Sequence, residues 1–269
     1  MNKQIIPGAE RKLKNHTSFR MTISNSLTMA YRSLLLIRRT PEQLFDVTVQ
    51  PILFTLMFAF LFGGAIAGNV HNYLPIIIPG ILVQTAITGC MATGVQLRED
   101  MDKGVFNRFK SFPIARIAPL TGPVLADLLR YGIATGLTFF MGYILGYRWA
   151  SLGGAVIGGL LVILAAWSIS WIFALLGVIA RTASTVQGIS AAILFPLVFL
   201  SNAFVPTNTL PGWLQAFVNV NPVTYIVSAT RQLFNQGTIG NDFWLSLIGV
   251  VAVVAVFAPL TLFAYMRKA

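Results

Sequence analysis

Long uncharged apolar runs dominate this sequence and constrain its fold more than any other feature. Residues 152–179 contain no charged side chain, and a helix needs only about 20 apolar residues to cross a bilayer. Charged residues make up 10% of the chain, against about 25% in an ordinary soluble domain. Such a chain cannot cover its apolar surface in water. We therefore expect an all-α, polytopic membrane protein.

The runs divide the chain into six predicted transmembrane helices within one domain, residues 22–269, after a polar tail of residues 1–21. Before the first span, residues 22–38 have apolar side chains at helical spacing beside arginines, which predicts a helix lying on the membrane surface. Between the last two spans, residues 206–237 predict two short helices on the outer side. The predicted spans are residues 47–67, 76–96, 124–146, 152–179, 183–205 and 243–265.

The positions of the basic residues predict the orientation. In this arrangement sixteen lysines and arginines lie on one side of the membrane, whereas Arg148 and Arg231 lie on the other. Cytoplasmic loops carry the excess of positive charge. Both termini are therefore expected in the cytoplasm, with the protein in a bacterial inner membrane. The net charge of +11 then reflects orientation and gives no reason to expect a nucleic-acid partner.

Motifs for catalysis are missing from the sequence. It contains no phosphate-binding G-x-x-x-x-G-K-[ST] loop and no Gly-Lys pair, so ATP hydrolysis by such a loop is excluded. His16, His71 and the lone Cys90 lie far apart in the chain, which predicts neither a metal site nor a nucleophile pair. We expect no catalytic residue, no metal and no cofactor bound by this chain.

Two charges fall inside a predicted span. Asp127 and Arg130 lie three residues apart near the start of the third span, so they share one face of a helix. The sequence predicts a structural ion pair at the membrane interface. A substrate or ion site remains the alternative, because carboxylates within membranes are functional by default.

The loop of residues 98–116 is the most distinctive polar segment. Acidic residues stand at its front and basic residues at its back, while Met101, Val105 and Phe109 form an apolar stripe. This pattern predicts a short amphipathic helix. The residues alone leave two roles open: a helix lying on lipid headgroups, or a helix that docks into a cytoplasmic partner.

Small-residue pairs recur within the apolar runs, with glycines four residues apart. Such pairs let helices approach closely, and most are expected to serve internal packing. One of them is a candidate for dimerisation. The pairs are Gly64/Gly68, Gly132/Gly136, Gly142/Gly146 and Gly154/Gly158.

Several short motifs in combination carry a family resemblance. They are Arg39-Thr40-Pro41, Gln50-Pro51, Phe62-Gly63, Pro79-Gly80, the loop from Arg98-Glu99-Asp100 to Phe112-Pro113-Ile114-Ala115-Arg116, Pro211-Gly212-Trp213, Asn221-Pro222-Val223-Thr224-Tyr225 and Arg231. With these motifs the chain resembles the ABC-2 type permeases, most closely the daunorubicin/doxorubicin-resistance permeases of bacteria.

The resemblance implies a partner and assigns the polar loop. It implies a permease that pairs with a second copy, each copy binding a separate ATPase subunit that holds ATP and Mg. Residues 98–116 would be the coupling helix, residues 22–38 the elbow helix, and residues 206–234 outer re-entrant helices. The implied ATPase contacts are Arg98, Glu99, Asp100, Met101, Asp102, Val105, Phe106, Arg108 and Phe109.

The expected activity is ATP-driven export of an apolar or amphipathic compound such as a drug or antibiotic. An exporter of a lipid-linked glycan or glycolipid with the same fold is the alternative. An ion-coupled carrier or channel is a third hypothesis. Ion coupling usually needs an ionisable group near mid-membrane, and the sequence predicts none there.

The orientation can be tested with reporter fusions. Reporters after Lys110, Arg181 or Ala269 should be cytoplasmic, and reporters near Asn72, Ser151 or Asn235 should be external, because of the charge asymmetry. Paired alkaline phosphatase and green fluorescent protein fusions measure this. An external reporter at Lys110 would contradict the whole arrangement.

Overall fold

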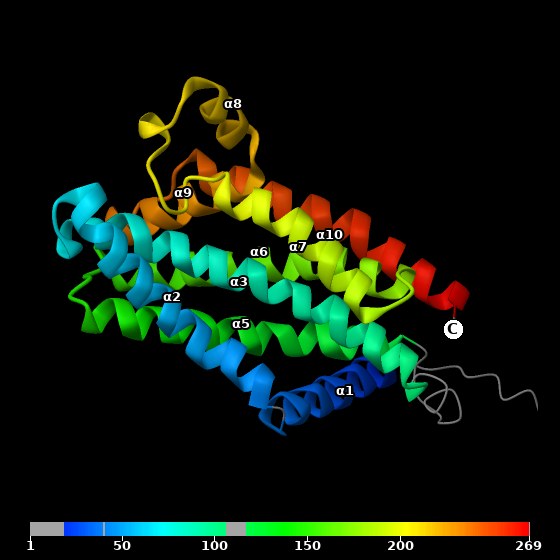
Figure 1. Cartoon of the computed structure of the whole chain (residues 1–269). Coiled ribbons are helices and arrows are strands. Elements are labelled where there is room, and N and C mark those ends of the chain that lie inside the picture. The colour runs from blue at the N-terminus through cyan, green and yellow to red at the C-terminus, as the bar shows by residue number, and fades with distance from the viewer. Residues whose placement is uncertain (1–18, 40, 106–116, 269) are drawn as a thin grey trace, which may run out of the picture.

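The structure, a computed structural model, describes residues 19–39, 41–105 and 117–268, and its regular elements in these ranges are helices. Figure 1 shows them as a bundle of long helices with shorter helices at its two ends. The helices are α1 (Phe19–Arg39), α2 (Pro41–Ala67), α3 (Val70–Asp102), α5 (Ala118–Ile144), α6 (Leu152–Ile179), α7 (Ala183–Phe199), α8 (Gly212–Val220), α9 (Pro222–Asn235) and α10 (Asn241–Lys268), with a short 3-10 turn at Thr207–Thr209.

Five helices in the described ranges are long and apolar enough to cross a membrane: α2 from Thr48, α3, α5, α6 and α10. The all-helical, multi-pass prediction is thereby confirmed. The predicted fifth span corresponds to α7, an apolar helix of 17 residues. The count of six spans therefore stays a prediction.

The end of α7 differs from the predicted span, which ran to residue 205. The helix ends at Phe199, and residues 200–205 bend away. The reason is a cap supplied from elsewhere in the chain, because Asn221 donates its side-chain N–H to the carbonyls of Leu197 and Leu200, each at 2.8 Å. Helix C-termini leave such carbonyls without partners. A cap more than twenty residues away leaves no local signal in the sequence.

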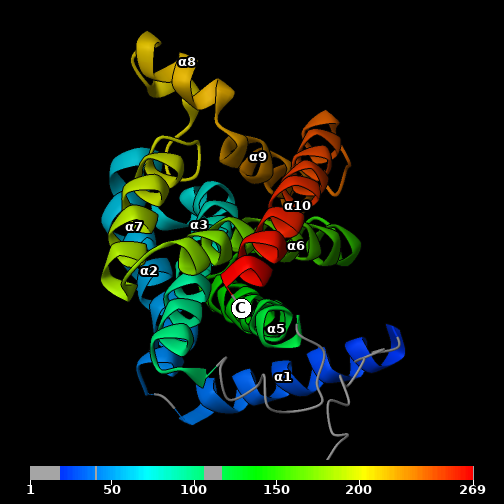
Figure 2. The ribbon, with the colours of Figure 1, turned by 90° about the vertical axis from the view of Figure 1, so that its right-hand side faces the viewer.

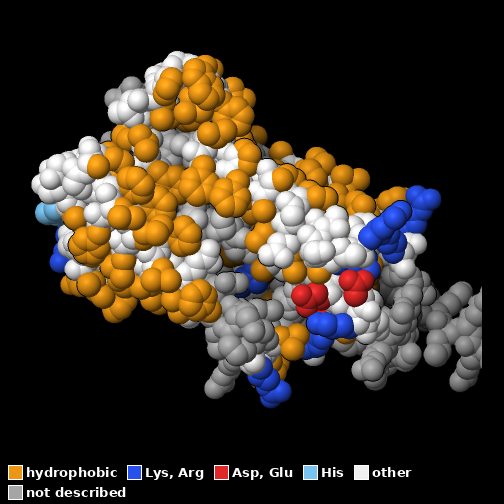
Figure 3. Space-filling view, in the orientation of Figure 1, with side chains coloured by type: hydrophobic (Ala, Val, Ile, Leu, Met, Phe, Trp, Pro, Cys, Tyr) orange, Lys and Arg blue, Asp and Glu red, His pale blue; other side chains and the backbone are white. Residues whose placement is uncertain are grey.

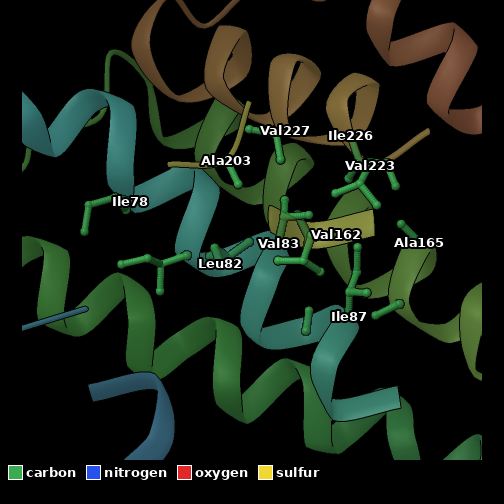
Figure 4. Packing of buried hydrophobic residues seen from close by; sticks show 14 of the residues in the cluster. Ile78, Leu82, Val83, Ile87, Val162, Ala165, Ala203, Val223, Ile226 and Val227 are labelled. Atoms are coloured by element: carbon green, nitrogen blue, oxygen red, sulfur yellow. The ribbon is translucent and has the colours of Figure 1, made fainter. Parts of the chain in front are cut away.

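Helix α3 is the centre of the bundle. It packs against α2, α5, α6, α7 and α9, and Figure 2 shows it surrounded by these neighbours. Its side chains Ile78, Leu82, Val83 and Ile87 meet residues of α6 and α9 in one apolar core (Figure 4). By contrast, only 6% of the most apolar stretch of α10 is buried inside the protein. Most of α10 thus presents its side chains to the surroundings of the bundle.

The backbones of α3 and α6 touch where two glycines meet. A Cβ atom added to Gly94 would lie 2.4 Å from the Phe173 carbonyl oxygen, and one added to Gly177 would lie 2.4 Å from the Gly94 oxygen. Real Cβ atoms do not approach oxygen so closely. The crossing of these two central helices therefore requires glycine on both sides.

The predicted small-residue pairs have different surroundings. Gly154 and Gly158 pack against Leu233 and Phe234 of α9, so this pair serves internal packing. Gly132 and Gly136, on α5, have open space where a Cβ would stand. Whether a pair serves dimerisation stays a prediction.

Helix α1 lies across one end of the bundle and crosses α5 (Figure 1). A Cβ on Gly122 of α5 would lie 2.4 Å from the Cβ of Met29, and the hydroxyls of Ser26 and Thr121 are hydrogen-bonded at 2.8 Å. Side chains such as Ile23 and Tyr31 on α1 remain exposed. This apolar exposure fits a helix that lies at a membrane surface.

At the other end of the bundle, α9 packs against α3, α6 and α10. The bend after α7 also presses on α3 there, because a Cβ on Gly80 would stand 1.8 Å from the Ala203 carbonyl oxygen. Tyr73 donates its hydroxyl to the Phe204 carbonyl at 2.8 Å. The bend is therefore held against α3 by backbone contact and by a buried hydrogen bond.

The contact at Gly80 predicts a sharp difference between two glycine substitutions. Gly80→Ala should destabilise the protein by about 1–3 kcal/mol, because the added methyl overpacks a backbone contact. Gly136→Ala is the matched control, since open space surrounds Gly136 and alanine favours a helix. Thermal unfolding of both variants in detergent, followed by size-exclusion chromatography, measures the difference. Equal melting temperatures would contradict the packing at Gly80.

Candidate functional site

The polar segment predicted as a separate loop helix begins as the last turn of α3. The helix runs unbroken to Asp102, and the chain then turns at Lys103 and Gly104. Gly104 has φ +66°, in the left-handed region that favours glycine. Residues 98–102 therefore form the last turn of α3. The predicted contact residues Phe106, Arg108 and Phe109 lie outside the described residues.

Two charged residues of this turn face the rest of the protein. Arg98 has a side chain 15% exposed; it pairs with Asp102 and donates to the Ala180 carbonyl at 2.9 Å. Asp100 has a side chain 14% exposed and lies 3.6 Å from the guanidinium of Arg32 in α1. Arg98 and Asp100 thus connect the end of α3 to the end of α6 and to α1. Met101 is partly buried and packs on a second apolar cluster.

The other side of the turn is open to solvent. Glu99 and Lys103 form an exposed ion pair at 2.9 Å, and the Glu99 carboxylate raises the pKa of the Lys103 amine above its ordinary value. Asp102 is also largely exposed, and Val105 is partly exposed. Figure 3 shows acidic and basic side chains gathered at this end of the bundle, while hydrophobic side chains cover most of the remaining face. The turn therefore offers a charged surface.

The C-terminal end of α6 is capped by two cations from other helices. Lys268 of α10 donates to the carbonyls of Val178 and Ile179 at 2.8 and 3.1 Å. Arg98 donates to the Ala180 carbonyl. These carbonyls have no partner within α6, and positive charge is favourable at a helix C-terminus. No local pattern indicated this arrangement: Lys268 was counted as an orientation charge, and Arg98 as an orientation charge and an implied ATPase contact.

The intramembrane pair forms a compact network between α5 and α3. Arg130 Nη1 lies 3.4 Å from Asp127 Oδ1, and Thr93 donates its hydroxyl to Asp127 Oδ2 at 2.5 Å. The other terminal nitrogen of Arg130 donates to the Gly89 carbonyl. Asp127 is 3% and Arg130 6% exposed. Both charges are thus buried, and each has partners of opposite polarity.

The start of the helix that holds this pair differs from the predicted span. Helix α5 begins at Ala118 rather than near residue 124. Asp127 therefore lies about 13 Å along the helix, at 1.5 Å per residue. Pro119 stands in the first turn of α5, where N–H groups have no helical partner and proline is tolerated. Asp127 and Arg130 lie together in the described structure, and their predicted place at the membrane interface stays a prediction.

Sequence reasoning also missed Arg231. It was counted as an outer charge, yet in α9 it donates to the carbonyls of Ile76 and Asn202 at 3.2 and 2.8 Å. Asn235, one turn along, donates to the Pro75 carbonyl at 2.9 Å. Pro79 has no N–H, so the Pro75 carbonyl lacks its usual helical partner. The Pro75/Pro79 spacing is the signal that an outside donor was needed.

No group of three or more His, Cys, Asp or Glu side chains that could hold a metal ion occurs in the described ranges. The site consists instead of a charged helical turn at one end and a buried ion pair within the bundle.

Comparisons with known proteins agree on one family. The model of the ABC-2 type transporter family matches residues 25–235. The daunorubicin resistance ABC transporter permease protein DrrB1 of Streptomyces coeruleorubidus is 42% identical over 252 residues, which cover 91% of this chain and 87% of that protein. The probable doxorubicin resistance ABC transporter permease protein DrrC of Mycobacterium tuberculosis is 27% identical, covering 87% of each chain. The inner membrane transport permease YadH of Escherichia coli is 26% identical, covering 78% of this chain and 81% of its own.

Substitutions of Asp127 and Arg130 should have strongly non-additive effects on the stability of the protein. Asp127→Leu should destabilise the protein by about 3–5 kcal/mol, because it leaves Arg130 charged and buried beside an apolar group. The double variant Asp127→Leu/Arg130→Leu should recover much of this loss. Unfolding by titration with sodium dodecyl sulfate, followed by circular dichroism, measures both.

The control for this cycle is Asp102→Leu, which alters a largely exposed carboxylate and should change stability by less than about 1 kcal/mol. If the double variant is no more stable than Asp127→Leu, Asp127 and Arg130 do not stabilise one another in the buried site.

Proposed function

Because the chain belongs to the ABC-2 type transporter family, we propose that it is the membrane-spanning permease subunit of an ATP-driven exporter. It moves an apolar or amphipathic compound such as a drug or antibiotic out of the cell. The observation that carries this proposal is the 42% identity, over 91% of the chain, to a permease whose name records daunorubicin resistance. The 27% identity to a probable doxorubicin resistance permease supports the same class of compound.

The chain crosses a bacterial inner membrane six times, with α7 as the fifth span. Helix α7 covers about 25 Å at 1.5 Å per residue, somewhat less than the hydrocarbon thickness of about 30 Å. The bend of residues 200–205 makes up the remainder, and its contacts with α3 satisfy polar groups such as the Phe204 carbonyl. Helices α8 and α9 are then outer re-entrant helices, and both termini are cytoplasmic. The excess of basic residues at the end where α1, α3 and α10 meet supports this orientation.

A separate ATPase subunit binds at the cytoplasmic end of α3 and holds ATP and Mg. The lack of a phosphate-binding loop in this sequence supports a separate subunit. The exposed Glu99 and Lys103 and the apolar stripe that continues from Met101 provide the docking surface. Two permeases and two ATPases form the working complex.

The predicted contact residues divide into two groups on this surface. Glu99, Asp102 and Val105 are accessible, so they contact the ATPase directly. Arg98 and Asp100 instead position the turn, because their side chains are engaged with Ala180 and Arg32. Movement of the docked ATPase is therefore transmitted by Arg98 to the end of α6 and by Asp100 to α1.

Substitution of two phenylalanines tests the docking surface. Phe106→Ala with Phe109→Ala should abolish co-purification of the ATPase and ATP-driven efflux, because aromatic anchors contribute about 2 kcal/mol or more each. The double variant should still insert and remain stable. Co-purification from membranes and efflux from vesicles, with the separate ATPase subunit co-expressed, are the measurements.

The matched control removes two phenyl rings elsewhere. Phe140→Ala with Phe263→Ala alters side chains that are 60% and 63% exposed on α5 and α10, and should leave ATPase capture unchanged. If the Phe106/Phe109 variant captures the ATPase and exports like the wild type, the segment rests on lipid and the coupling role is wrong.

A further inference from the structure

A narrow apolar crevice of about 160 Å³ lies between α6, α7, α9 and α10. Helices α7 and α10 stand apart in Figure 2. The rim of the crevice is open to the surroundings of the bundle, because Ile193 of α7 is 39% and Leu245 of α10 is 50% exposed. Its volume is below the range of about 300–1,000 Å³ that is usual for drug-sized ligands. The crevice is therefore too small to hold a whole drug-sized molecule.

The described side chains that line the crevice leave no polar group unpaired. Most of them are isoleucine, leucine and valine. The hydroxyls of Ser168, Tyr225 and Ser246 each donate to a main-chain carbonyl at 2.7 Å. Water occupies a buried site only where it finds polar partners. A hydrocarbon chain is thus the occupant that this wall fits best.

The crevice follows α10 through about the depth of one leaflet. Leu245, Gly249 and Val253 line it at a spacing of four residues, so they share one face of the helix. From Leu245 to Val253 this face is about 12 Å long at 1.5 Å per residue, and half of a hydrocarbon core of about 30 Å is about 15 Å. A Cβ added to Gly249 would meet open space. The crevice therefore has the length for an acyl chain and open space at its middle.

A carboxylate stands at one end of the crevice. Asp242 precedes Leu245 and Ser246 by three and four residues, so it lies on the same face of α10. It is partly exposed, and no ion pair among the described residues includes it. Its neighbour Trp244 is 57% exposed, and tryptophan is enriched at the level of the lipid headgroups. Asp242 therefore places a negative charge at headgroup depth beside an apolar crevice.

We infer that Asp242 and the crevice together bind one phospholipid with an amine headgroup, such as phosphatidylethanolamine. The ammonium group pairs with the Asp242 carboxylate, and one acyl chain lies in the crevice against Gly249. A phospholipid with an anionic headgroup, such as phosphatidylglycerol, is repelled by Asp242 and has only the chain contact. The inference goes beyond the proposed export function and does not depend on it.

Competition between two lipids that differ only in the headgroup tests this inference. The purified permease is given equal amounts of dioleoyl phosphatidylethanolamine and dioleoyl phosphatidylglycerol in detergent, and native mass spectrometry measures how much of each lipid stays bound. The wild type should prefer phosphatidylethanolamine by on the order of fivefold, as one exposed ion pair gives. Glycerophosphoethanolamine, which has the headgroup but no chains, should not compete at the same concentration.

Two kinds of substitution separate the headgroup contact from the chain contact. Asp242→Asn should abolish the preference, while Asp242→Glu, which keeps the charge, should retain it. Gly249→Leu should weaken the binding of both lipids by on the order of tenfold, because the new side chain takes the place of about two CH2 groups of the acyl chain. The added side chain meets open space, so this variant is expected to fold. Gly188→Leu, at another open position on α7 outside the crevice, is the matched control and should change neither affinity.

Equal retention of the two lipids by the wild type, a preference that survives Asp242→Asn, or unchanged lipid binding by Gly249→Leu would each overturn the inference. Size-exclusion chromatography of the same variants identifies another occupant. If Gly249→Leu breaks up a dimer and leaves lipid binding unchanged, a second copy covers the crevice and the lipid assignment is wrong. The assay uses neither the ATPase nor ATP, so failure of the export function and failure of this inference are distinguishable.

Discussion

The need to satisfy every backbone polar group inside hydrocarbon governs this structure. At three places where a helix ends or a proline removes an N–H, a side chain from another element supplies the missing partner. Asn235 donates a hydrogen bond to the carbonyl of Pro75, and Asn221 donates to two carbonyls at the end of α7. Lys268 and Arg98 donate to carbonyls at the end of α6. These contacts join elements far apart in the sequence. They therefore determine how the helices are arranged as well as where they end.

Helix α3 combines the features on which the proposed function depends. Its N-terminal end is held by α9 and by the bend after α7, its middle lies in the apolar core, and its C-terminal end carries the exposed turn with Glu99 and Lys103. One continuous helix thus connects the proposed ATPase surface to the core of the bundle. A movement of the turn need not cross a loop to reach that core.

The sequence predicted the parts of the fold that depend on local composition. The bounds of α6 agree with the uncharged run of residues 152–179, and the family resemblance is confirmed by the match over residues 25–235. Features that depend on distant partners were missed. The burial of Asp127 depends on Thr93 of another helix, the role of Arg98 depends on Ala180, and the end of α7 depends on Asn221. No local pattern identifies such partners, because each is fixed only once the helices have packed.

The glycine crossing of α3 and α6 has a mechanical consequence. Because backbone meets backbone at Gly94 and Gly177, no side chain separates the two helices there, and a rigid tilt of α3 against α6 would pivot about this crossing. At 1.5 Å per residue, Glu99 lies about 7 Å from this point and Gly80 about 21 Å on the other side. If α3 tilts as a rigid rod, a displacement of its short arm, which ends near Glu99, is amplified about threefold at the long arm. A small movement at Glu99 then becomes a larger movement at Gly80, in the opposite direction.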